Sequence, residues 1–241
     1  MSKRFVVNEN EMKAQGNILN IFGSSANHIN VLRHKAGDIL EINENIVRVL
    51  NVSKENIECE IVGLAKKRGE PKTEITLYQG YLKSDKMENI TQKSVELGVK
   101  HIVPFLSKNT VVKLDDKDKI KKVERLGKIA GEAIQQCGRT DNVTVCNVEN
   151  FKDLIDSLKQ NDINVLAYEL SSNSLKEVLK GQNNITKVGI IVGSEGGFEQ
   201  GEIDFLMSKL DNIYEVSLGE RILRSETASA YLLSIIGYEF N

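Results

Sequence analysis

Short runs of alternating apolar and polar residues fill the first 70 positions of this 241-residue chain. They predict five strands, at residues 4–7, 17–22, 39–42, 46–50 and 57–64. The intervening segments, such as residues 23–27 and 35–38, carry glycine, serine, asparagine and aspartate, residue types typical of turns. Short strands, turn signals and little helical periodicity together predict a small β-barrel.

A polar and basic segment at residues 65–72 contains Pro71, one of only two prolines in the chain. Such segments connect domains, because few packing contacts cross them. We therefore predict two domains, at residues 1–70 and 71–241.

Strands and helices alternate beyond this segment. Apolar runs predict strands at residues 75–82, 101–106, 164–169, 187–193 and 213–218. Apolar residues at helical spacing predict a helix that is capped by Ser84 or Asp85 and ends at Gly98, and others at residues 120–137, 174–180, 200–210 and 226–236. This alternation predicts an α/β domain whose parallel sheet is covered on both faces.

Composition narrows the class of protein. Hydrophobic residues make up 40% and charged residues 27% of the chain, values typical of globular proteins. Cys59, Cys137 and Cys146 lie far apart, which argues against a disulfide framework and a structural zinc site, and we expect no metal. No apolar run is long enough to cross a bilayer, and the N-terminus lacks signal-peptide character, so we expect a cytoplasmic protein.

The net charge of −2 is unevenly distributed along the chain. Residues 71–140 hold 14 Lys/Arg and 9 Asp/Glu, net +5, whereas residues 141–241 hold 8 and 16, net −8. A basic middle segment is consistent with binding to a polyanion such as nucleic acid. It is equally consistent with a solvated helix face, because lysines and aspartates interleave at residues 115–122.

The strongest local feature is a buried apolar strand that runs directly into a glycine-rich turn, Gly-Ser-Glu-Gly-Gly-Phe, at residues 193–198. In open α/β sheets, ligands bind at the carboxyl ends of strands, where glycines let backbone amides approach closely. The turn lacks both the P-loop lysine and the Gly-x-Gly-x-x-Gly spacing of dinucleotide sites. Taken alone, it is more typical of an ordinary strand–helix connection.

A second feature follows the last predicted strand, where Arg221 and Arg224 precede a helix that Ser225 is positioned to cap. Cations beside the positive end of a helix dipole require a balancing anion. That anion could be a ligand, or Glu220 and Glu226 on the surface. The final helix is apolar nearly all round, which predicts burial in a core or an interface.

Two weaker features could contact RNA. Gln136 and Arg139 lie at a helix end, where they could reach RNA or a partner subunit, and His28, Arg33 and His34 lie near a loop of the N-terminal part. For each, an ordinary surface role is an adequate alternative.

Taken in order, these segments resemble the RsmE-type family, the 16S rRNA uridine-N3 methyltransferases of the SPOUT superfamily. The resemblance spans nearly the whole chain. It runs through residues 28–33, 86–99, 132–139, 192–197 and 218–228, which include Val-Gly-Ser-Glu-Gly-Gly and Leu-Gly-Glu-Arg-Ile-Leu-Arg-Ser-Glu-Thr-Ala. The family often has proline where this chain has Ser194.

The resemblance implies a fold beyond what the patterns alone predict. The N-terminal part would be a PUA-like β-barrel that holds RNA. The C-terminal part would be a SPOUT-type parallel sheet with a deep trefoil knot, a rare exception among protein chains. Such proteins act as homodimers, bind S-adenosylmethionine in the knot and release S-adenosylhomocysteine.

The resemblance also assigns roles to residues. The glycine-rich loop, the arginine-containing loop and the end of the strand at residues 164–169 would bind the cofactor. The residues are Leu166, Glu169, Val192, Gly193, Ser194, Glu195, Gly196, Gly197, Ser217, Leu218, Gly219, Ile222 and Leu223. Two cations and one acid beside the expected methyl donor then suggest catalytic roles. Arg224, or Arg221 in its place, would stabilise negative charge that develops on the uracil oxygens. Glu226 would accept the N3 proton or orient the arginine.

The remaining basic residues would contact the small ribosomal subunit through its 16S rRNA. The candidates for RNA binding are Arg4, His28, Arg33, Lys83, Lys86, Lys93, Gln136 and Arg139, together with Lys108, Lys113, Lys66, Lys67 and Arg68.

Three alternatives remain open from the sequence. The chain could methylate another RNA, or it could be a non-catalytic RNA-binding protein of ribosome assembly. It could also be a different α/β enzyme that uses the glycine-rich turn for a phosphate, which the missing nucleotide signatures disfavour.

Overall fold

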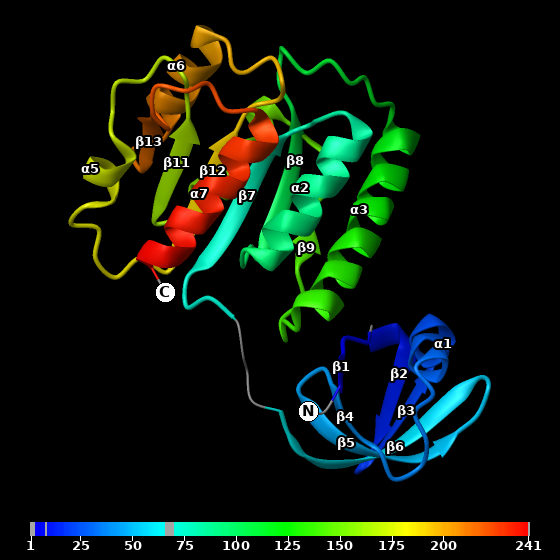
Figure 1. Cartoon of the computed structure of the whole chain (residues 1–241). Coiled ribbons are helices and arrows are strands. Elements are labelled where there is room, and N and C mark those ends of the chain that lie inside the picture. Colours follow the sequence, from blue (N-terminus) through cyan, green and yellow to red (C-terminus); the bar gives the residue numbers. More distant parts are fainter. Residues whose placement is uncertain (1–2, 8, 66–69, 241) are drawn as a thin grey trace. The chain divides into compact units, whose positions relative to one another are not determined.

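The chain folds into two compact units in a computed structural model that describes residues 3–7, 9–65 and 70–240. One unit comprises Met1–Glu70 with Ile134–Asp141, and the other comprises Pro71–Ala133 with Asn142–Asn241 (Figure 1). The boundary beside Glu70 coincides with the polar segment noted in the sequence. Lys66, Lys67 and Arg68, proposed for RNA contact, lie outside the described residues.

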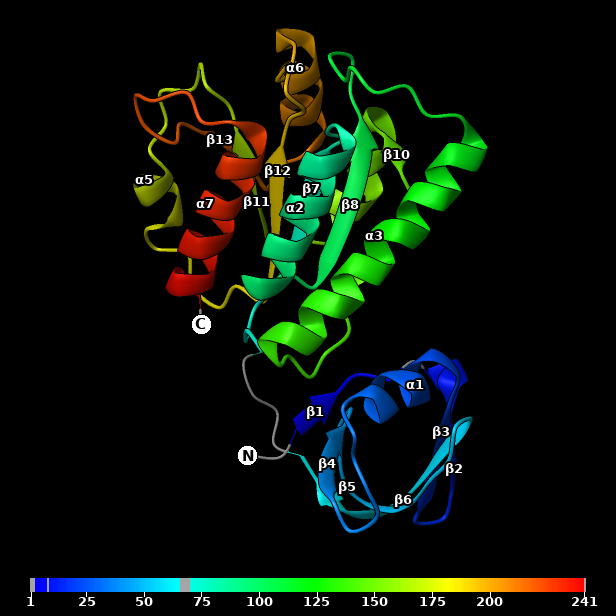
Figure 2. The same cartoon turned by 45° about the vertical axis from the view of Figure 1, so that its right-hand side comes forward.

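The first unit is a six-stranded, curled sheet with strand order β1-β4-β5-β6-β3-β2 (Figure 2). All neighbours pair antiparallel except β1 and β4. Its interior is a cluster of buried aliphatic side chains that includes Ile21, Leu40, Val47 and Ile57. The strands are β1 (Lys3–Phe5), β2 (Met12–Gln15), β3 (Ile18–Phe22), β4 (Ile39–Ile42), β5 (Asn45–Val52) and β6 (Asn56–Leu64), with a 3-10 turn η1 (Glu9–Glu11).

One expectation for this unit was wrong. Residues 23–27, predicted as a turn, begin helix α1 (Gly23–Val31). The Glu11 carboxylate accepts hydrogen bonds from the amides of Ser24 and Ser25, so a distant residue satisfies the first donors of the helix. Burial of Ala26 and Ile29 then fixes the helix against the sheet. Neither contact is visible in the local sequence.

The second unit confirms the predicted α/β class with a parallel sheet. Its seven strands follow the order β10-β8-β7-β12-β11-β13, with β9 also beside β8, and every pairing is parallel. They are β7 (Glu74–Gly80), β8 (His101–Leu106), β9 (Thr144–Val145), β10 (Glu149–Asn150), β11 (Ile163–Ala167), β12 (Lys187–Val192) and β13 (Ile213–Val216).

Helices cover both faces of this sheet, as predicted. Helices α2 (Ser84–Glu96) and α7 (Ser225–Glu239) lie side by side on one face, with α3 (Asp116–Cys137) next to α2 (Figure 1, Figure 2). The other face is covered by η2 (Phe151–Leu154), α4 (Ile155–Leu158) and α6 (Gln200–Lys209), and the short α5 (Leu175–Leu179) packs beside β13. The helix predicted to be capped by Ser84 or Asp85 begins at Ser84 itself, so Lys83 flanks it.

Side chains alternate between the two faces along each central strand. In β11, Val165 belongs to the core beneath α2 and α7, whereas Leu166 belongs to the core beneath α4 and α6. Because the strands are parallel, the carboxyl ends of β7, β12, β11 and β13 meet at one edge of the sheet. The loops that follow these strands therefore come together there.

Candidate functional site

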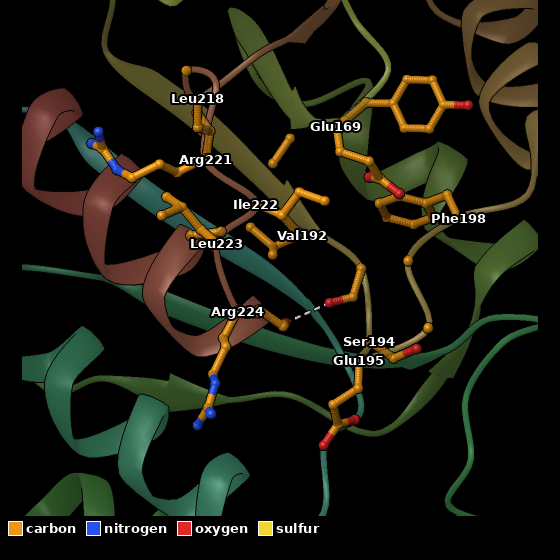
Figure 3. A pocket seen from close by; sticks show the side chains of 18 of the residues that line it. Glu169, Val192, Ser194, Glu195, Phe198, Leu218, Arg221, Ile222, Leu223 and Arg224 are labelled. Atoms are coloured by element: carbon orange, nitrogen blue, oxygen red, sulfur yellow. Dashed lines mark hydrogen bonds between the residues drawn. The ribbon is translucent and has the colours of Figure 1, made fainter.

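A cavity of about 680 Å³ opens at this carboxyl edge of the sheet (Figure 3). That volume lies within the range of small-molecule sites. Its walls are the glycine loop after β12, the arginine loop after β13 and the end of β11. The residues that line it are Lys86, Ala167, Tyr168, Glu169, Val192, Gly193, Ser194, Glu195, Gly196, Gly197, Phe198, Leu218, Gly219, Glu220, Arg221, Ile222, Leu223, Arg224, Ser225 and Ala228.

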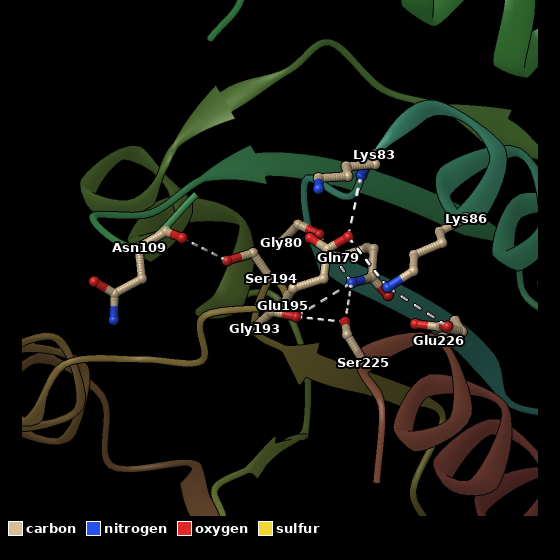
Figure 4. Close-up of polar contacts among 10 residues, drawn as sticks. All are labelled: Gln79, Gly80, Lys83, Lys86, Asn109, Gly193, Ser194, Glu195, Ser225 and Glu226. Carbon is tan, nitrogen blue, oxygen red and sulfur yellow. Dashed lines mark hydrogen bonds and ion pairs between the residues drawn. The ribbon is translucent and has the colours of Figure 1, made fainter. Parts of the chain in front are cut away.

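The glycine loop is a tight turn that leaves no room for side chains at its glycines. The Gly197 amide donates to the Ser194 carbonyl at 3.0 Å, and Gly197 has φ +64°, in the left-handed region that favours glycine. A Cβ on Gly196 would lie 2.8 Å from the Asn109 carbonyl oxygen. Asn109 in turn donates to the Gly196 carbonyl at 3.0 Å and accepts from the Ser194 hydroxyl, which fixes the loop from outside (Figure 4).

A buried polar network beneath the cavity connects the two loops (Figure 4). Gln79, fully buried at the end of β7, donates through Nε2 to the Ser225 hydroxyl at 2.9 Å. Ser225 donates onward to the Gly193 carbonyl at 2.5 Å. Ser229 donates to Gln79 Oε1 at 2.6 Å, so each polar group of the Gln79 side chain is satisfied. The network fixes the start of α7 against the glycine loop.

This network corrects the role predicted for Ser225. Helix α7 begins at Ser225 and Arg224 is its N-cap residue, without a side-chain capping bond. The Ser225 hydroxyl instead donates to the Gly193 carbonyl of the glycine loop. Sequence spacing identifies a serine near a helix start, but it does not show that a carbonyl from another loop competes for its hydroxyl.

The two arginines of the second loop extend in different directions from the cavity wall (Figure 3). Both are exposed, and neither side chain makes a hydrogen bond or ion pair among the residues that the structure describes. The alternative in which Glu220 and Glu226 balance them on the surface is therefore not what the structure shows. Arg224 lies on the side of the cavity where Glu195 is found, and Arg221 lies beside Leu218.

Glu226 pairs with a lysine instead. Its Oε1 atom lies 3.8 Å from Lys86 Nζ, and the same ammonium lies 3.4 Å from Glu195 Oε1. The other carboxylate oxygen, Glu226 Oε2, is buried and has no hydrogen-bond partner among the described residues. Lys86, expected to contact RNA, thus lies in the cavity wall with two carboxylates around it.

Two of the residues predicted to bind a cofactor lie away from the cavity. Leu166 is fully buried in the opposite core, because it occupies the other face of β11 from Val165. Ser217 lies just before the cavity wall, where it forms a bridge with Ser174 and accepts from the Gly219 amide. Glu226 flanks the cavity through its pair with Lys86 without lining it.

Several lining residues were not predicted. Ala167 is the last residue of β11, Tyr168 follows it, and Phe198 closes the glycine loop. The rule that ligands bind at carboxyl ends of parallel strands could have identified all three. Ala228 and Ser225 line the cavity through the first turn of α7, which no local pattern reveals.

Several of the residues predicted for RNA contact lie on the surface. His28, Arg33, Lys83, Lys113 and Gln136 are exposed. Lys93 pairs with Glu96, and Lys108 pairs with Glu199.

Arg4 and Arg139 are held inside the first unit. Arg4 lies 2.7 Å from Glu41 and donates to the Gly138 carbonyl. Arg139 is 4% exposed and donates from Nε and Nη2 to Glu70. This corrects the expectation for Arg139, because a buried, paired guanidinium is not available to RNA phosphates.

Within the described part of the chain, no three His, Cys, Asp or Glu residues are grouped so that they could hold a metal ion. Likewise, no helix among those residues has the length and apolar character needed to traverse a membrane.

Comparison with known proteins identifies the family. Residues 69–237 match a family described as RNA methyltransferase domain. The chain is 32% identical to ribosomal RNA small subunit methyltransferase E of Bacillus subtilis, over 99% of this chain and 97% of that protein. It is 33% identical to the protein of that name from Mesomycoplasma hyopneumoniae, over 96% and 97%. The chain belongs to the ribosomal RNA small subunit methyltransferase E family.

Solved structures agree with this assignment. A structure from Legionella pneumophila, described as a methyltransferase with bound S-adenosylmethionine, superimposes with a TM-score of 0.85 at 26% identity, and the match covers 99% of this chain and 98% of that one. The family match and these relatives confirm the resemblance to this family noted in the sequence.

Proposed function

We propose that this methyltransferase E family member transfers a methyl group from S-adenosylmethionine to N3 of a specific uridine in small-subunit 16S rRNA. The observation that carries the proposal is the cavity between the glycine and arginine loops, in a chain that matches the family along nearly its full length. The Legionella structure with bound S-adenosylmethionine supports the choice of cofactor.

The cavity fits such a cofactor. Gly193, Gly196 and Gly197 form a cradle in which added Cβ atoms would meet the backbone or a side chain at 2.8–3.2 Å, so the backbone itself faces the cavity. Val192, Leu218 and Leu223 supply apolar wall for an adenine ring. Glu169 is exposed in the cavity wall, where its carboxylate would accept a hydrogen bond from a ribose hydroxyl. When bound, S-adenosylmethionine supplies an electrophilic methyl group on its sulfonium.

The residues around the cavity can activate the uracil. N3 of neutral uridine carries a proton, which must leave as the new N–C bond forms. Arg224, which lines the cavity and is exposed without an ion pair among the described residues, would stabilise negative charge on the uracil oxygens. Glu226, whose carboxylate pairs with Lys86 beside the cavity, would accept the proton.

The proposal extends to the architecture that the family implies. The curled sheet of the first unit would serve as the PUA-like barrel that holds RNA. The two loops that enclose one cavity from a single sheet edge would form a deep trefoil knot of the SPOUT type. A homodimer is supported by α7, whose outer side exposes Tyr231 and Tyr238 although the helix is mostly apolar.

Two measurements test the function together. Titration calorimetry with S-adenosylmethionine measures cofactor binding, and labelled S-adenosylmethionine measures transfer to unmodified small subunits and to naked 16S rRNA. We expect both binding and transfer, with the ratio between subunits and naked rRNA showing which form is recognised. Binding without transfer would indicate another RNA substrate. If neither binding nor transfer were observed, the proposal that this protein is an enzyme would be contradicted.

The affinity for rRNA should fall steeply with salt. Each phosphate contact made by a lysine contributes about 0.7–0.9 to the slope of log affinity against log salt. Lys83 is exposed and makes no side-chain ion pair among the described residues, so Lys83→Met should make the slope shallower by about that amount. Filter binding between low and physiological salt measures both slopes. A salt-independent wild-type affinity would contradict the proposed basic RNA surface.

The Glu70–Arg139 pair should stabilise the fold in a pH-dependent way. Burial raises the pKa of Glu70, but hydrogen bonds from Arg139 and from the amides of Asp141 and Thr140 outweigh it and hold that pKa below its usual value of 4.5. A carboxyl group whose pKa is lower in the folded protein stabilises the fold when the pH is above its unfolded pKa. This stabilisation is lost as the pH falls through the folded pKa. Glu70→Gln should therefore lower the free energy of unfolding by about 3 kcal/mol at pH 7, because a buried guanidinium loses its counter-charge.

Urea unfolding of the wild type and Glu70→Gln at pH 7 and at successively lower pH measures this effect. The difference in free energy of unfolding between the two proteins should become smaller at pH values below the unfolded pKa of Glu70. A difference that stays constant with pH would show that the ion pair is not its origin.

A further inference from the structure

Lys86 occupies the first turn of α2, where its side chain reaches across to the loops of the cavity (Figure 4). Its ammonium lies between two carboxylates, Glu195 of the glycine loop at 3.4 Å and Glu226 of α7 at 3.8 Å. The three side chains are 35%, 22% and 20% exposed, so they are only partly screened by water. Glu195 is held further by the Lys83 amide, which donates to the same Oε1 at 3.4 Å.

We propose that Lys86 is a positioning residue for methyl transfer: its ammonium holds the Glu226 carboxylate at the cavity, and Glu195 keeps that ammonium balanced when Glu226 receives a proton. This inference rests on the proposed function. It replaces the expectation that Lys86 contacts an RNA phosphate.

Because Lys86 is shared by Glu195 and Glu226, it keeps a counter-ion throughout the reaction. The N3–H bond breaks and its proton passes to Glu226, while the N3–methyl bond forms and the sulfur–methyl bond breaks. The sulfonium charge and the developing uracil anion cancel each other. Glu226 becomes neutral in this step, and Glu195 remains as the counter-ion of Lys86. A lysine paired with Glu226 alone would instead be left without a counter-ion.

The geometry also argues against a phosphate role. A phosphate approaching Lys86 would meet Glu195 and Glu226, whose negative charges oppose it. Lys83, three residues earlier, is exposed and has no acidic side chain paired with it among the described residues. Lys83 is therefore the matched comparison: the same residue type, immediately before α2, whose ammonium pairs with neither carboxylate among the described residues.

Steady-state methyl transfer to unmodified small subunits by wild type, Lys86→Met, Lys86→Arg and Lys83→Met tests the inference. Lys86→Met should lower kcat roughly 10- to 100-fold, less than the loss of a proton acceptor. Its KM for the subunit should stay within about twofold of wild type, and its salt slope should not change. Lys86→Arg should recover most of kcat, because a guanidinium can still pair with both carboxylates. Lys83→Met should show the opposite pattern, with a raised KM and a shallower salt slope.

Calorimetric affinity for S-adenosylmethionine and the thermal unfolding midpoint show whether each variant is folded. If Lys86→Met were unfolded, Glu195→Gln would serve in its place. It removes the balancing carboxylate and should also lower kcat without affecting the salt slope.

Two results would overturn the inference. One is a Lys86→Met variant with intact kcat, raised KM and shallower salt slope, which would make Lys86 a phosphate contact. The other is a loss of kcat that Lys86→Arg does not recover. A wild type that transfers no methyl group would instead remove the proposed function itself.

Discussion

Replacement of Arg224 by alanine is expected to lower kcat for methyl transfer by about 10²–10³-fold, the range found when one donor to a developing oxyanion is removed. The arginine lies at the cavity wall, exposed and without an ion pair among the described residues, so its charge is available to the substrate. Affinity for S-adenosylmethionine should change little, because the interaction forms with uracil. Single-turnover transfer from labelled cofactor, with calorimetry for binding, separates the two effects.

Arg221→Ala is the matched control for this prediction. Arg221 lies in the same loop and is equally exposed, but its side chain extends in another direction from the cavity (Figure 3). We expect its loss to lower kcat less than tenfold. A large loss of kcat in Arg221→Ala with a small one in Arg224→Ala would show that Arg221 has the role assigned to Arg224. Rates near wild type in both variants would show that neither arginine stabilises the transition state.

Gly80→Ala should weaken cofactor binding by about 100-fold although Gly80 does not line the cavity. An added Cβ would lie 2.3 Å from the Ser194 amide nitrogen and 2.6 Å from the Gly193 carbonyl carbon. Both atoms are backbone, so the glycine loop itself must move. A displaced loop that loses two hydrogen bonds to the cofactor, at about 1.4 kcal/mol each, loses about 10²-fold in affinity, and overpacking a buried site lowers stability by about 1–3 kcal/mol.

Calorimetry and urea unfolding measure these two effects, with Gly127→Ala as the control. Gly127 lies within α3, and an added Cβ there would meet nothing within 4 Å. That variant should bind the cofactor normally and gain about 0.5–1 kcal/mol from its helical propensity. Normal cofactor binding by Gly80→Ala would show that the loop is not held by its contact with β7.

The second unit was largely predictable because its signals are local. The apolar run of β12 followed by a glycine turn identifies both a buried strand and the loop at its end, and the alternation of elements predicts the parallel sheet. Strand order places those loops together, and this step needs only the rule for carboxyl ends of parallel strands. The glycine and arginine loops are therefore predictable as cavity walls, whereas Ala167, Tyr168, Phe198 and the contributions of α2 and α7 were not predicted.

The features that sequence did not reveal depend on distant partners. Gly23–Val31 is helical because Glu11 satisfies its first amides. Arg139 is buried because Glu70 lies beside it, and Lys86 lies at the cavity because α2 packs on α7. Charge identifies each basic residue, but only the tertiary fold decides whether its partner is a phosphate or a carboxylate.

Identification of the methylated atom tests the central claim most directly. N3 carries the Watson–Crick donor of uracil, so a methyl group there blocks base pairing and stops reverse transcription. Unmodified small subunits would be incubated with the protein and S-adenosylmethionine, and the rRNA analysed by primer extension and nucleoside mass spectrometry. We predict one new stop and a single 3-methyluridine per subunit. A methyl group on another atom or on the ribose, with no stop, would contradict the account.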